Sequence, residues 1–346
     1  MKNVKLLILI FVVLVSGRSH AQAQFENFIK SGTDDANVLL NHYMSPILKG
    51  VGYGFNSGWY NTAKPHETLG FDFSLAFNAT YIPVADQSFE FDPTEYNITR
   101  IKSGQSTLPT IMGNNSSTTL ENYISDPNLP PPGEISLGTF NAPNGIADNI
   151  QSVVKKVFFP TPIIQAGIGA IKGSEIKIRW MPSINTKSFS FKYFGVGGLH
   201  SISQWIPVLK NLPVDISAFV GYTKIDAEYP IPAGGIVGEN QLSSFGINTL
   251  TYQIIASAHV SVITGYVGLG MDNFKTTFKM LGTYDTYPNE PLVPILVDPI
   301  SLEQQGTGGF RTTVGARVKL AILTLHADYT IREYKTLTAG LGFTFR

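Results

Sequence analysis

The residues of this sequence that could do chemistry are charged side chains that recur at every second position of several apolar stretches. A period of two places such side chains on one face of a strand. Seven are basic, four are acidic, and a histidine accompanies them. If this face lined a pore, its basic side chains would favour negative solutes. The candidates are Asp72, Glu175, Lys177, Arg179, Lys192, Asp215, Arg311, Arg317, Lys319, His326, Asp328 and Arg332.

The same charges could instead satisfy one another inside a narrow enclosed space. Buried charges persist where they are paired and hydrogen-bonded, and Asp34 and Asp35 of an upstream segment offer two further carboxylates. We favour this pairing over an anion path. His326 and Asp328 share one strand face, and we assign them to the same network rather than to catalysis.

Catalytic patterns are weak in comparison. A hydrolase needs a nucleophilic serine with a histidine at hydrogen-bond distance, and no histidine after the first 23 residues lies in such a motif. These histidines are isolated in sequence: His42, His66, His200, His259 and His326. The chain has no cysteine, and no histidine pair has zinc-ligand spacing. With 25 basic and 25 acidic residues, nothing indicates nucleic-acid binding. We therefore expect no enzyme, no metal site and no cofactor.

The elements that would position the charges are strands, and they are clearest near the C-terminus. Apolar residues alternate with polar ones in Phe310–Leu320, Leu323–Arg332 and Leu337–Phe345, and again in Leu69–Tyr81. A soluble sandwich would alternate too, with its polar face in water. Here the polar face is rich in charge and glycine, yet charged residues make up only 14% of the chain, against about 25% in soluble domains. A membrane β-barrel, apolar toward lipid and polar toward its lumen, explains this combination.

The connections between these stretches predict the topology. From Leu69 onward we count ten strands, and all the long connections fall on one side, as outer loops do in bacterial barrels. A strand at Gly50–Tyr60, or one within the longest loop, would raise this number. We therefore expect an all-β fold, a transmembrane antiparallel up-and-down barrel of about 12 strands, within a range of roughly 10–14. The long connections are Val84–Pro160, Glu228–Ser244 and Gly282–Gly308.

The N-terminus has the pattern of a secretory signal peptide. Two lysines precede the apolar run Leu6–Val15, and Ala21–Ala23 offers a small-x-small cleavage site. The run is shorter than the about 20 residues of a spanning helix. We expect residues 1–23 to be removed after Ala23, and the rest of the chain to reach the bacterial outer membrane.

A helical segment, residues 24–49, precedes the barrel, which we place at 50–346 with a long outer loop at 84–160. Apolar residues recur there at helical spacing after a capped start at Thr33, and Pro46 is expected to end or kink the helix. Such a helix could plug the lumen or cover its rim, and both alternatives remain open. Its candidate residues are Asp34, Asp35, Leu39, Leu40 and Tyr43.

The stretch Gly50–Tyr60 could be a first strand or an irregular part of the plug. Tryptophan is enriched where barrels meet the membrane interface. The tryptophans are therefore expected to be interface anchors: Trp59, Trp180 and Trp205.

Four stretches, spread over most of the chain, resemble an uncharacterised outer-membrane β-barrel family of Bacteroidota. They are Gly58–His66, Leu69–Asp72, Gln204–Pro207 and Thr324–Thr330. The resemblance implies the same barrel fold and carries no established activity. More loosely, a helix ahead of a barrel is similar to the long-chain fatty-acid transporter family, which implies a plug, although that family's Asn-Pro-Ala motif is missing here.

These observations predict a passive or gated channel or transporter for a small solute. The apolar stripe of the helix favours a hydrophobic or amphipathic solute, which the sequence does not identify. The alternative is a closed barrel that acts in envelope structure, adhesion or secretion through its outer loops. The expected partners are outer-membrane lipid and the barrel-assembly machinery during biogenesis. Solute leakage that rises when the helix is removed would favour the channel.

Overall fold

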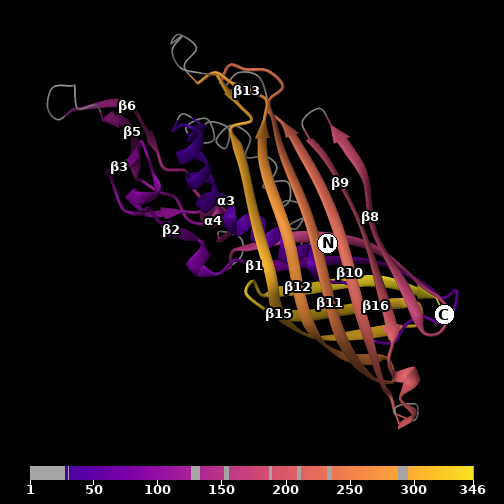
Figure 1. Cartoon of the computed structure of the whole chain (residues 1–346). Coiled ribbons are helices and arrows are strands. Elements are labelled where there is room, and N and C mark those ends of the chain that lie inside the picture. Colours follow the sequence, from indigo (N-terminus) through magenta and orange to yellow (C-terminus); the bar gives the residue numbers. More distant parts are fainter. Residues whose placement is uncertain are drawn as a thin grey trace.

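Ten strands form one closed antiparallel barrel in which neighbours along the chain pair and the last strand pairs with the first (Figure 1). The structure, a computed structural model, describes residues 28–29, 31–125, 133–151, 156–186, 189–208, 212–231, 236–286 and 295–345. The expected signal peptide lies outside the described residues. The barrel strands are β1 (Phe71–Tyr81), β7 (Phe158–Gly169), β8 (Ser174–Thr186), β9 (Phe189–Ser201), β10 (Val214–Pro230), β11 (Leu242–Val260), β12 (Ile263–Leu281), β15 (Ile300–Leu320), β16 (Leu323–Ile331) and β17 (Thr336–Phe345).

The predicted all-β antiparallel up-and-down barrel is confirmed, but it has ten strands rather than the preferred twelve. Gly50–Tyr60 adds no strand because its first part is helical, and the strands of the longest loop form separate small sheets. At one end of the barrel, three connections have only two to four residues and the fourth, 202–213, has twelve; the connections 82–157, 231–241 and 282–299 lie at the other end. We call these the short-turn end and the long-connection end. The pairing of β12 with β15 contains a bulge, seen as a register shift between Asp272 and Phe274.

Helix α3 (Thr33–Asn56) runs from the long-connection end into the lumen. Near its start, the Asn37 side chain donates to the carbonyl oxygen of Pro299 at 2.9 Å. At its last residue, the Asn56 side chain donates to the carbonyl oxygen of Asn273 in β12 at 3.0 Å. Residues 57–70 then lead to β1 at the short-turn end. No described helix combines the length and apolar character needed to cross a membrane.

The predicted boundary, with the helical segment ending at residue 49 and the barrel starting at residue 50, is wrong. Pro46 lies inside the helix, which continues through the glycine-rich residues 50–54. Glycine and proline are poor helix formers, but tertiary packing overrides propensity here, because this part of α3 is enclosed by the barrel wall.

The long-connection end carries a folded unit that we call the cap domain (Figure 1). It combines residues 82–157, the N-terminal half of α3 and the hairpin β13–β14. The long connection predicted at 84–160 lies between β1 and β7, and its strands form two small sheets, β2–β4 and β3–β5–β6. Its elements are η1 (Val84–Asp86), β2 (Ser88–Glu90), η2 (Pro93–Glu95), β3 (Thr99–Ser103), β4 (Thr107–Pro109), β5 (Thr119–Ser125), β6 (Glu134–Asn141), α4 (Ala147–Gln151), β13 (Thr283–Tyr284) and β14 (Leu296–Val297).

The apolar stripe of α3 forms the core of this cap domain. Leu39, Leu40 and Tyr43 are buried there against side chains of β2, β4 and β5 and of the outer parts of β12 and β15. The stripe is thus covered by protein, which removes the reason for expecting a hydrophobic solute. The core members from outside the helix include Phe91, Leu108, Leu120, Phe278 and Leu302.

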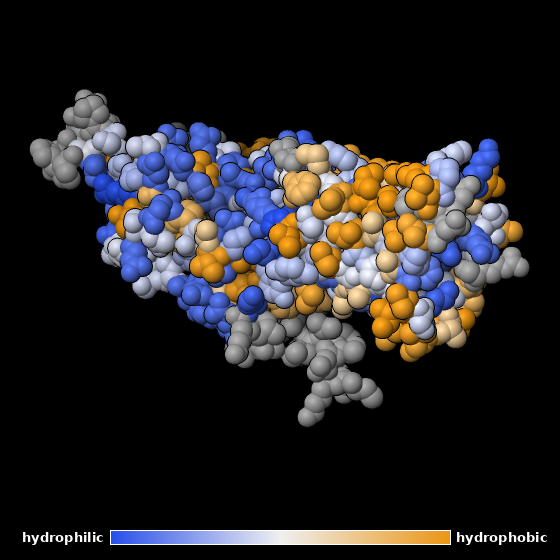
Figure 2. Space-filling model, turned by 90° about the horizontal axis from the view of Figure 1, so that it is seen from below, coloured by the Kyte–Doolittle hydropathy of each residue, from blue (hydrophilic) through white to orange (hydrophobic). Residues whose placement is uncertain are grey.

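The outer wall of the barrel is apolar. Each of the ten strands exposes at least one large apolar side chain, whereas alternate residues face inward. In Figure 2, orange side chains gather over the barrel strands, and the end that carries the cap domain is largely blue. This distribution is typical of a barrel that spans a membrane. Examples of the exposed residues are Phe71, Ile168, Ile176, Phe194, Val220, Ile254, Leu269, Phe310, Leu325 and Leu341.

Candidate functional site

The candidate site is the lumen, where two glycines let α3 approach the barrel wall. A Cβ atom on Gly52 would lie 2.5 Å from ring carbons of Phe274, and one on Gly54 would lie 2.1 Å from Oγ1 of Thr161. Only a residue without a side chain fits such contacts. The glycine-rich stretch that resembled a strand therefore marks the place where the helix is enclosed.

Three buried arginines bind the C-terminal end of α3. Nη1 and Nη2 of Arg179, in β8, donate to the carbonyl oxygens of Phe55 and Ser57 at 2.7 and 2.8 Å. Nη1 of Arg311, in β15, donates to the carbonyl oxygen of Asn56 at 2.8 Å. Nη2 of Arg332, just after β16, donates to the carbonyl oxygen of Tyr53 at 2.6 Å.

These contacts satisfy the end of the helix electrostatically. The last carbonyl groups of a helix have no partners within it and carry partial negative charge, which favours cations nearby. The arginines come from three different strands or strand ends, so they hold the helix from several sides of the barrel. Three of the basic residues predicted to face the lumen thus bind the plug.

One carboxylate balances part of this positive charge. Asp272 is buried, and its Oδ1 accepts from Nη1 of Arg311 at 3.1 Å while its Oδ2 pairs with Nη1 of Arg332. The guanidinium of Arg179 instead stacks on Trp59, 3.6 Å from the ring centroid. A cation over an indole ring is stabilised by its quadrupole. Among the predicted charges, Lys177 pairs with Glu175. The carboxylate that pairs with Arg311 and Arg332 is Asp272, which the prediction did not name, and not Asp34 or Asp35.

Asp35 has a different role. Its carboxylate accepts from the backbone N–H groups of Asn97, Ile98 and Thr99 at 2.8–2.9 Å. Asp34 is exposed at the start of the helix. Both therefore lie in the cap domain, where Asp35 ties α3 to the chain that leads into β3.

The prediction that Trp59 anchors the membrane interface is wrong. It is 1% exposed and lies inside the lumen, against Phe219 and the inward-facing Gly197 and Gly221. Trp59 is buried in the lumen because its indole ring has two partners there, the ring of Phe219 and the guanidinium of Arg179. Trp180 and Trp205 are exposed, at 58% and 69%.

The segment 57–70 fills the lumen below the helix. The Tyr60 hydroxyl donates to Oε1 of Gln253 at 2.6 Å, and the Ala63 N–H donates to the hydroxyl of Ser257 at 3.0 Å. Nη1 of Arg317 donates to Oδ1 of Asn61 at 3.0 Å. Together with the helix contacts, side chains from around the barrel wall bind the plug down to the short-turn end.

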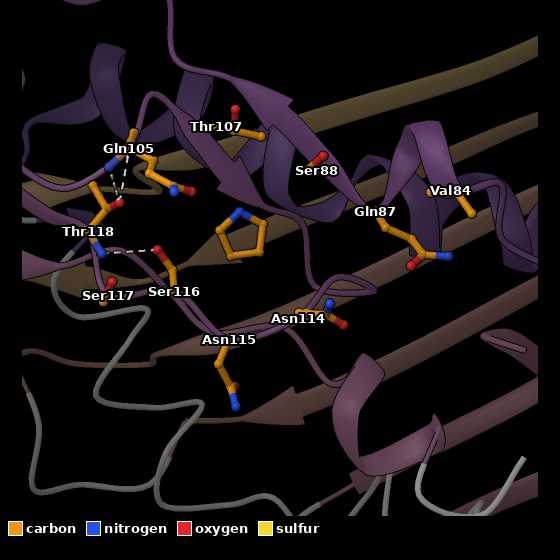
Figure 3. Close-up of a pocket in the computed structure, with 11 residues that line it drawn as sticks. Val84, Gln87, Ser88, Gln105, Thr107, Asn114, Asn115, Ser116, Ser117 and Thr118 are labelled. Atoms are coloured by element: carbon orange, nitrogen blue, oxygen red, sulfur yellow. Dashed lines mark hydrogen bonds between the residues drawn. The ribbon is translucent and has the colours of Figure 1, made fainter. Parts of the chain in front are cut away.

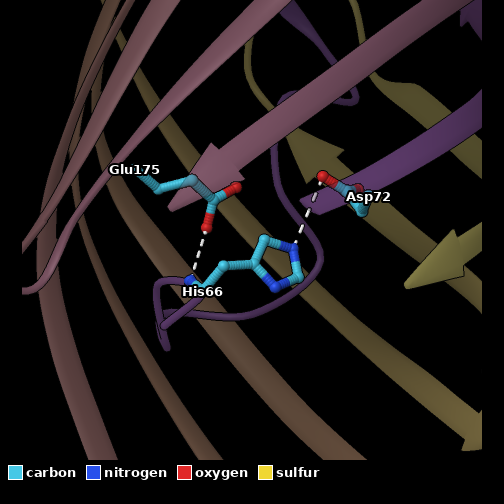
Figure 4. Close-up of side chains that lie close together, drawn as sticks. All are labelled: His66, Asp72 and Glu175. Atoms are coloured by element: carbon cyan, nitrogen blue, oxygen red, sulfur yellow. Dashed lines mark hydrogen bonds and ion pairs between the residues drawn. The ribbon is translucent and has the colours of Figure 1, made fainter. Parts of the chain in front are cut away.

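A cluster of titratable residues lies where the plug reaches that end (Figure 4). Nε2 of His66 is 3.5 Å from Oδ1 of Asp72, and the His66 N–H donates to Oε2 of Glu175 at 3.0 Å. The donor atoms of these three residues lie within 4.8 Å of one another, a spacing that could suit a metal ion. However, the ammonium of Lys177 already pairs with Glu175. We therefore interpret the cluster as a polar attachment of the plug to β1 and β8.

The remaining predicted lumen residues lie as follows. Asp328 is buried and accepts from the Tyr266 hydroxyl at 3.0 Å. His326 is also buried, next to Gly340. Asp215 and Lys319 are half-buried and lie near the short-turn end.

The prediction that Lys192 faces the lumen is wrong. Its side chain is 57% exposed and lies 3.8 Å from Asp226. Its neighbour Tyr193 points inward instead, because Phe55 of the plug provides an aromatic partner with ring centroids 5.6 Å apart.

Sequence reasoning missed two groups of site residues. Asp272 lies beside the bulge, where strict alternation fails. Gly52 and Gly54 belong to the ambiguous stretch, and their spacing of two residues suggested a strand as readily as a helix. The useful signal was the run of glycines itself, which marks close backbone approach.

Comparison with known proteins places the chain in a family. The description "Family of unknown function (DUF6588)" matches residues 1–345. No curated protein matches the chain. Among solved structures, the translocator domain of autotransporter NalP from Neisseria meningitidis is 10% identical with a TM-score of 0.30, and the match covers 90% of this chain and 98% of that one.

Two further solved structures show similarly low scores. The beta domain of the Bordetella autotransporter Brka is 10% identical, with a TM-score of 0.24 and coverage of 80% of this chain and 100% of that one. A mutant of TodX, a monoaromatic hydrocarbon channel, is 8% identical, with a TM-score of 0.17 and coverage of 81% and 91%. These likenesses are too weak to support a function. The chain belongs to the family of unknown function DUF6588.

Proposed function

We propose that this protein is an outer-membrane barrel that is closed by its own plug and that presents the cap domain outside the cell. The observation that carries this proposal is the path of α3, whose C-terminal half fills the lumen while its N-terminal half forms the core of the cap domain. Its function then lies in what the cap domain contacts. The proposal assigns it no enzymatic role.

The outer wall and the connections support the membrane placement. Every barrel strand exposes large apolar side chains, which would contact lipid. The longest connections, 82–157 and 282–299, lie at the same end, as outer loops do, and three of the four connections at the other end have the two to four residues of periplasmic turns. The cap domain, on the long-connection end, would face the cell exterior, and insertion would depend on barrel-assembly machinery.

The hydrogen bonds of the plug support a closed lumen. Moving α3 would leave Arg179, Arg311 and Arg332 without the carbonyl groups that they bind. It would also have to pull the N-terminal half of the helix out of an apolar core. Both halves therefore oppose opening.

A gated channel is the second candidate, and one observation favours it. The lumen half of α3 is held mainly by hydrogen bonds and ion pairs, which water could replace if the helix moved. The vacated wall would then present three arginines and a carboxylate to a solute. In this case the plug would be mobile at rest or upon a signal.

Single-cysteine labelling tests the proposed orientation, because the chain has no native cysteine. We expect Asp34→Cys, on the exposed start of α3, to react with a membrane-impermeant maleimide on intact cells. Val208→Cys, exposed in the connection between β9 and β10, should react only after the outer membrane is permeabilised. The reverse pattern would show that the cap domain faces the periplasm.

A further inference from the structure

A polar pocket of about 360 Å³ lies in the cap domain (Figure 3). It is open to solvent and is lined by η1, the start of β2, Gln105, the strand β4 and the loop 114–118. This size falls at the lower end of the range of small-molecule sites. None of the residues that bind the plug in the lumen lines this pocket.

The lining of this pocket is uniform in chemistry. Nine of its eleven residues have neutral polar side chains, and the other two are Val84 and Pro109. None of the described residues that line it is charged or aromatic. Amides and hydroxyls each offer donors and acceptors, so the pocket can match a ligand whose own groups both donate and accept.

Several of these polar side chains have donors and acceptors that no protein group occupies. Within the part of the chain that the structure describes, the side chains of Gln105, Asn114 and Ser117 make no hydrogen bond. All three are exposed to solvent. They surround the space shown in Figure 3, with Val84, 81% exposed, at its rim.

The backbone behind these groups is held in place. Oγ1 of Thr118 accepts from the Gln105 N–H at 3.0 Å and donates to the Gln105 carbonyl oxygen at 3.2 Å. The Ser116 N–H donates to Oδ1 of Asn144 at 2.9 Å. A wall fixed before binding lowers the entropy cost of ordering it around a ligand.

We propose that this pocket binds a neutral saccharide. Adjacent hydroxyl groups of a sugar ring would meet the free amides and hydroxyl, and Val84 would contact the apolar face of the ring. The described lining offers no arginine or lysine for charge-assisted binding of an anion, and no carboxylate for a divalent cation. An apolar ligand would leave the polar wall desolvated without partners.

This inference rests on the proposed function only for the source of the ligand, which would be a glycan outside the cell. The binding itself can be measured on the purified full chain. An amine-oxide detergent should be used, because many common detergents carry sugar headgroups. The probes are neutral trisaccharides of glucose, mannose and N-acetylglucosamine, with a sulfated trisaccharide as the charged comparison.

Isothermal titration calorimetry should give saturable binding of at least one neutral trisaccharide. The double variant Gln105→Ala/Asn114→Ala should weaken it about tenfold or more, since each lost hydrogen bond contributes several-fold in affinity. Thr139→Ala, exposed on β6 of the same domain and outside the pocket, should leave it unchanged. Hydrogen exchange of the core around Leu108 and Leu120 would verify that the double variant is folded.

Three results would overturn the inference: no saturable binding of any neutral probe, equal binding by the folded double variant, or tighter binding of the sulfated probe. The same neutral probe should also bind intact cells. If it binds the purified chain and not intact cells, the saccharide pocket stands and the outward orientation of the cap domain fails.

Discussion

The two halves of α3 are held by opposite kinds of interaction. The N-terminal half buries Leu39, Leu40 and Met44 in an apolar core shared with the cap domain. The C-terminal half lies against a wall of polar side chains, and buried arginines bind its carbonyl groups. One continuous helix thus runs from an apolar core, like that of a water-soluble protein, into a hydrophilic lumen.

This difference follows from what surrounds each half. A barrel with lipid outside must turn its polar residues inward, so whatever fills the lumen has to satisfy hydrogen-bonding groups. The helix end does so with its own backbone carbonyls, which would otherwise lack partners. The cap domain has water outside, so its interior is free to be apolar.

The change expected to destabilise the lumen half most is removal of Asp272, the carboxylate that forms ion pairs with both Arg311 and Arg332. Asp272→Ala would leave Arg311 and Arg332 buried without their anion. Breaking a buried pair in this way costs about 3–5 kcal/mol. We expect a matching fall in the free energy of unfolding, measured in urea on protein refolded into liposomes.

Glu303→Gln is the matched control, because it removes an exposed partner of Lys275 on the same pair of strands. Its urea midpoint should stay at the value of the unaltered chain. An unchanged midpoint for Asp272→Ala would mean that the buried arginines do not depend on this carboxylate.

We expect that the cap domain can be destabilised without destabilising the barrel. Leu40→Ala deletes a fully buried side chain from the cap core, and such changes cost about 2–5 kcal/mol. We expect faster hydrogen exchange in β2–β6, with the barrel strands unaffected. Exchange that rises equally in β8 and β15 would show that the two halves unfold together.

A steric change probes how closely the helix fits the lumen. Gly54→Ala places a methyl group against Thr161, and overpacking of this kind costs about 1–3 kcal/mol. The double variant Gly54→Ala/Thr161→Ala should recover part of the loss, because it removes the clashing hydroxyl. Urea midpoints of the two variants measure both effects, and no recovery would mean that the strain lies elsewhere.

The smallest effect expected is a pH dependence confined to the cap domain. Hydrogen bonds from Ser136 and then Lys102 lower the pKa of Glu121 from 4.5 to about 2. The stabilisation is therefore fully present above pH 4.5 and is lost as the pH falls toward 2. Hydrogen exchange of β5 and β6, corrected for intrinsic rates, should rise across this window. Glu121→Gln should abolish the dependence.

Much of the barrel could be predicted because alternation reports directly which side chains face inward. Arg179, Arg311 and Arg332 were placed in the lumen on this ground alone. Their partner could not be predicted, because a backbone carbonyl leaves no signature in sequence. Trp59 was misplaced for a related reason, because it lies on the plug, where Arg179 stacks on its ring. Lys192 was misplaced because its neighbour Tyr193 faces inward, where Phe55 of the plug is its aromatic partner.

The cap domain was the least predictable part. Its strands are short, and the core that joins them comes from the distant helix α3 and from β12 and β15. Asp35 illustrates the difficulty, since it looked like a helix-start residue and in fact accepts from three backbone N–H groups more than sixty residues away. Such contacts follow from the fold and not from local pattern.

The most direct test of a closed lumen is to measure the ion conductance of a variant whose plug can be fixed to the barrel wall by a disulfide. A Cβ atom on Gly50 would lie 3.3 Å from Cβ of Phe159, close to the about 3.8 Å of a disulfide, so Gly50→Cys/Phe159→Cys should tie α3 to β7. In planar bilayers we expect no steady conductance from this variant, whether the disulfide is oxidised or reduced. A conductance that is present when reduced and disappears on oxidation would contradict the closed barrel and establish a mobile plug.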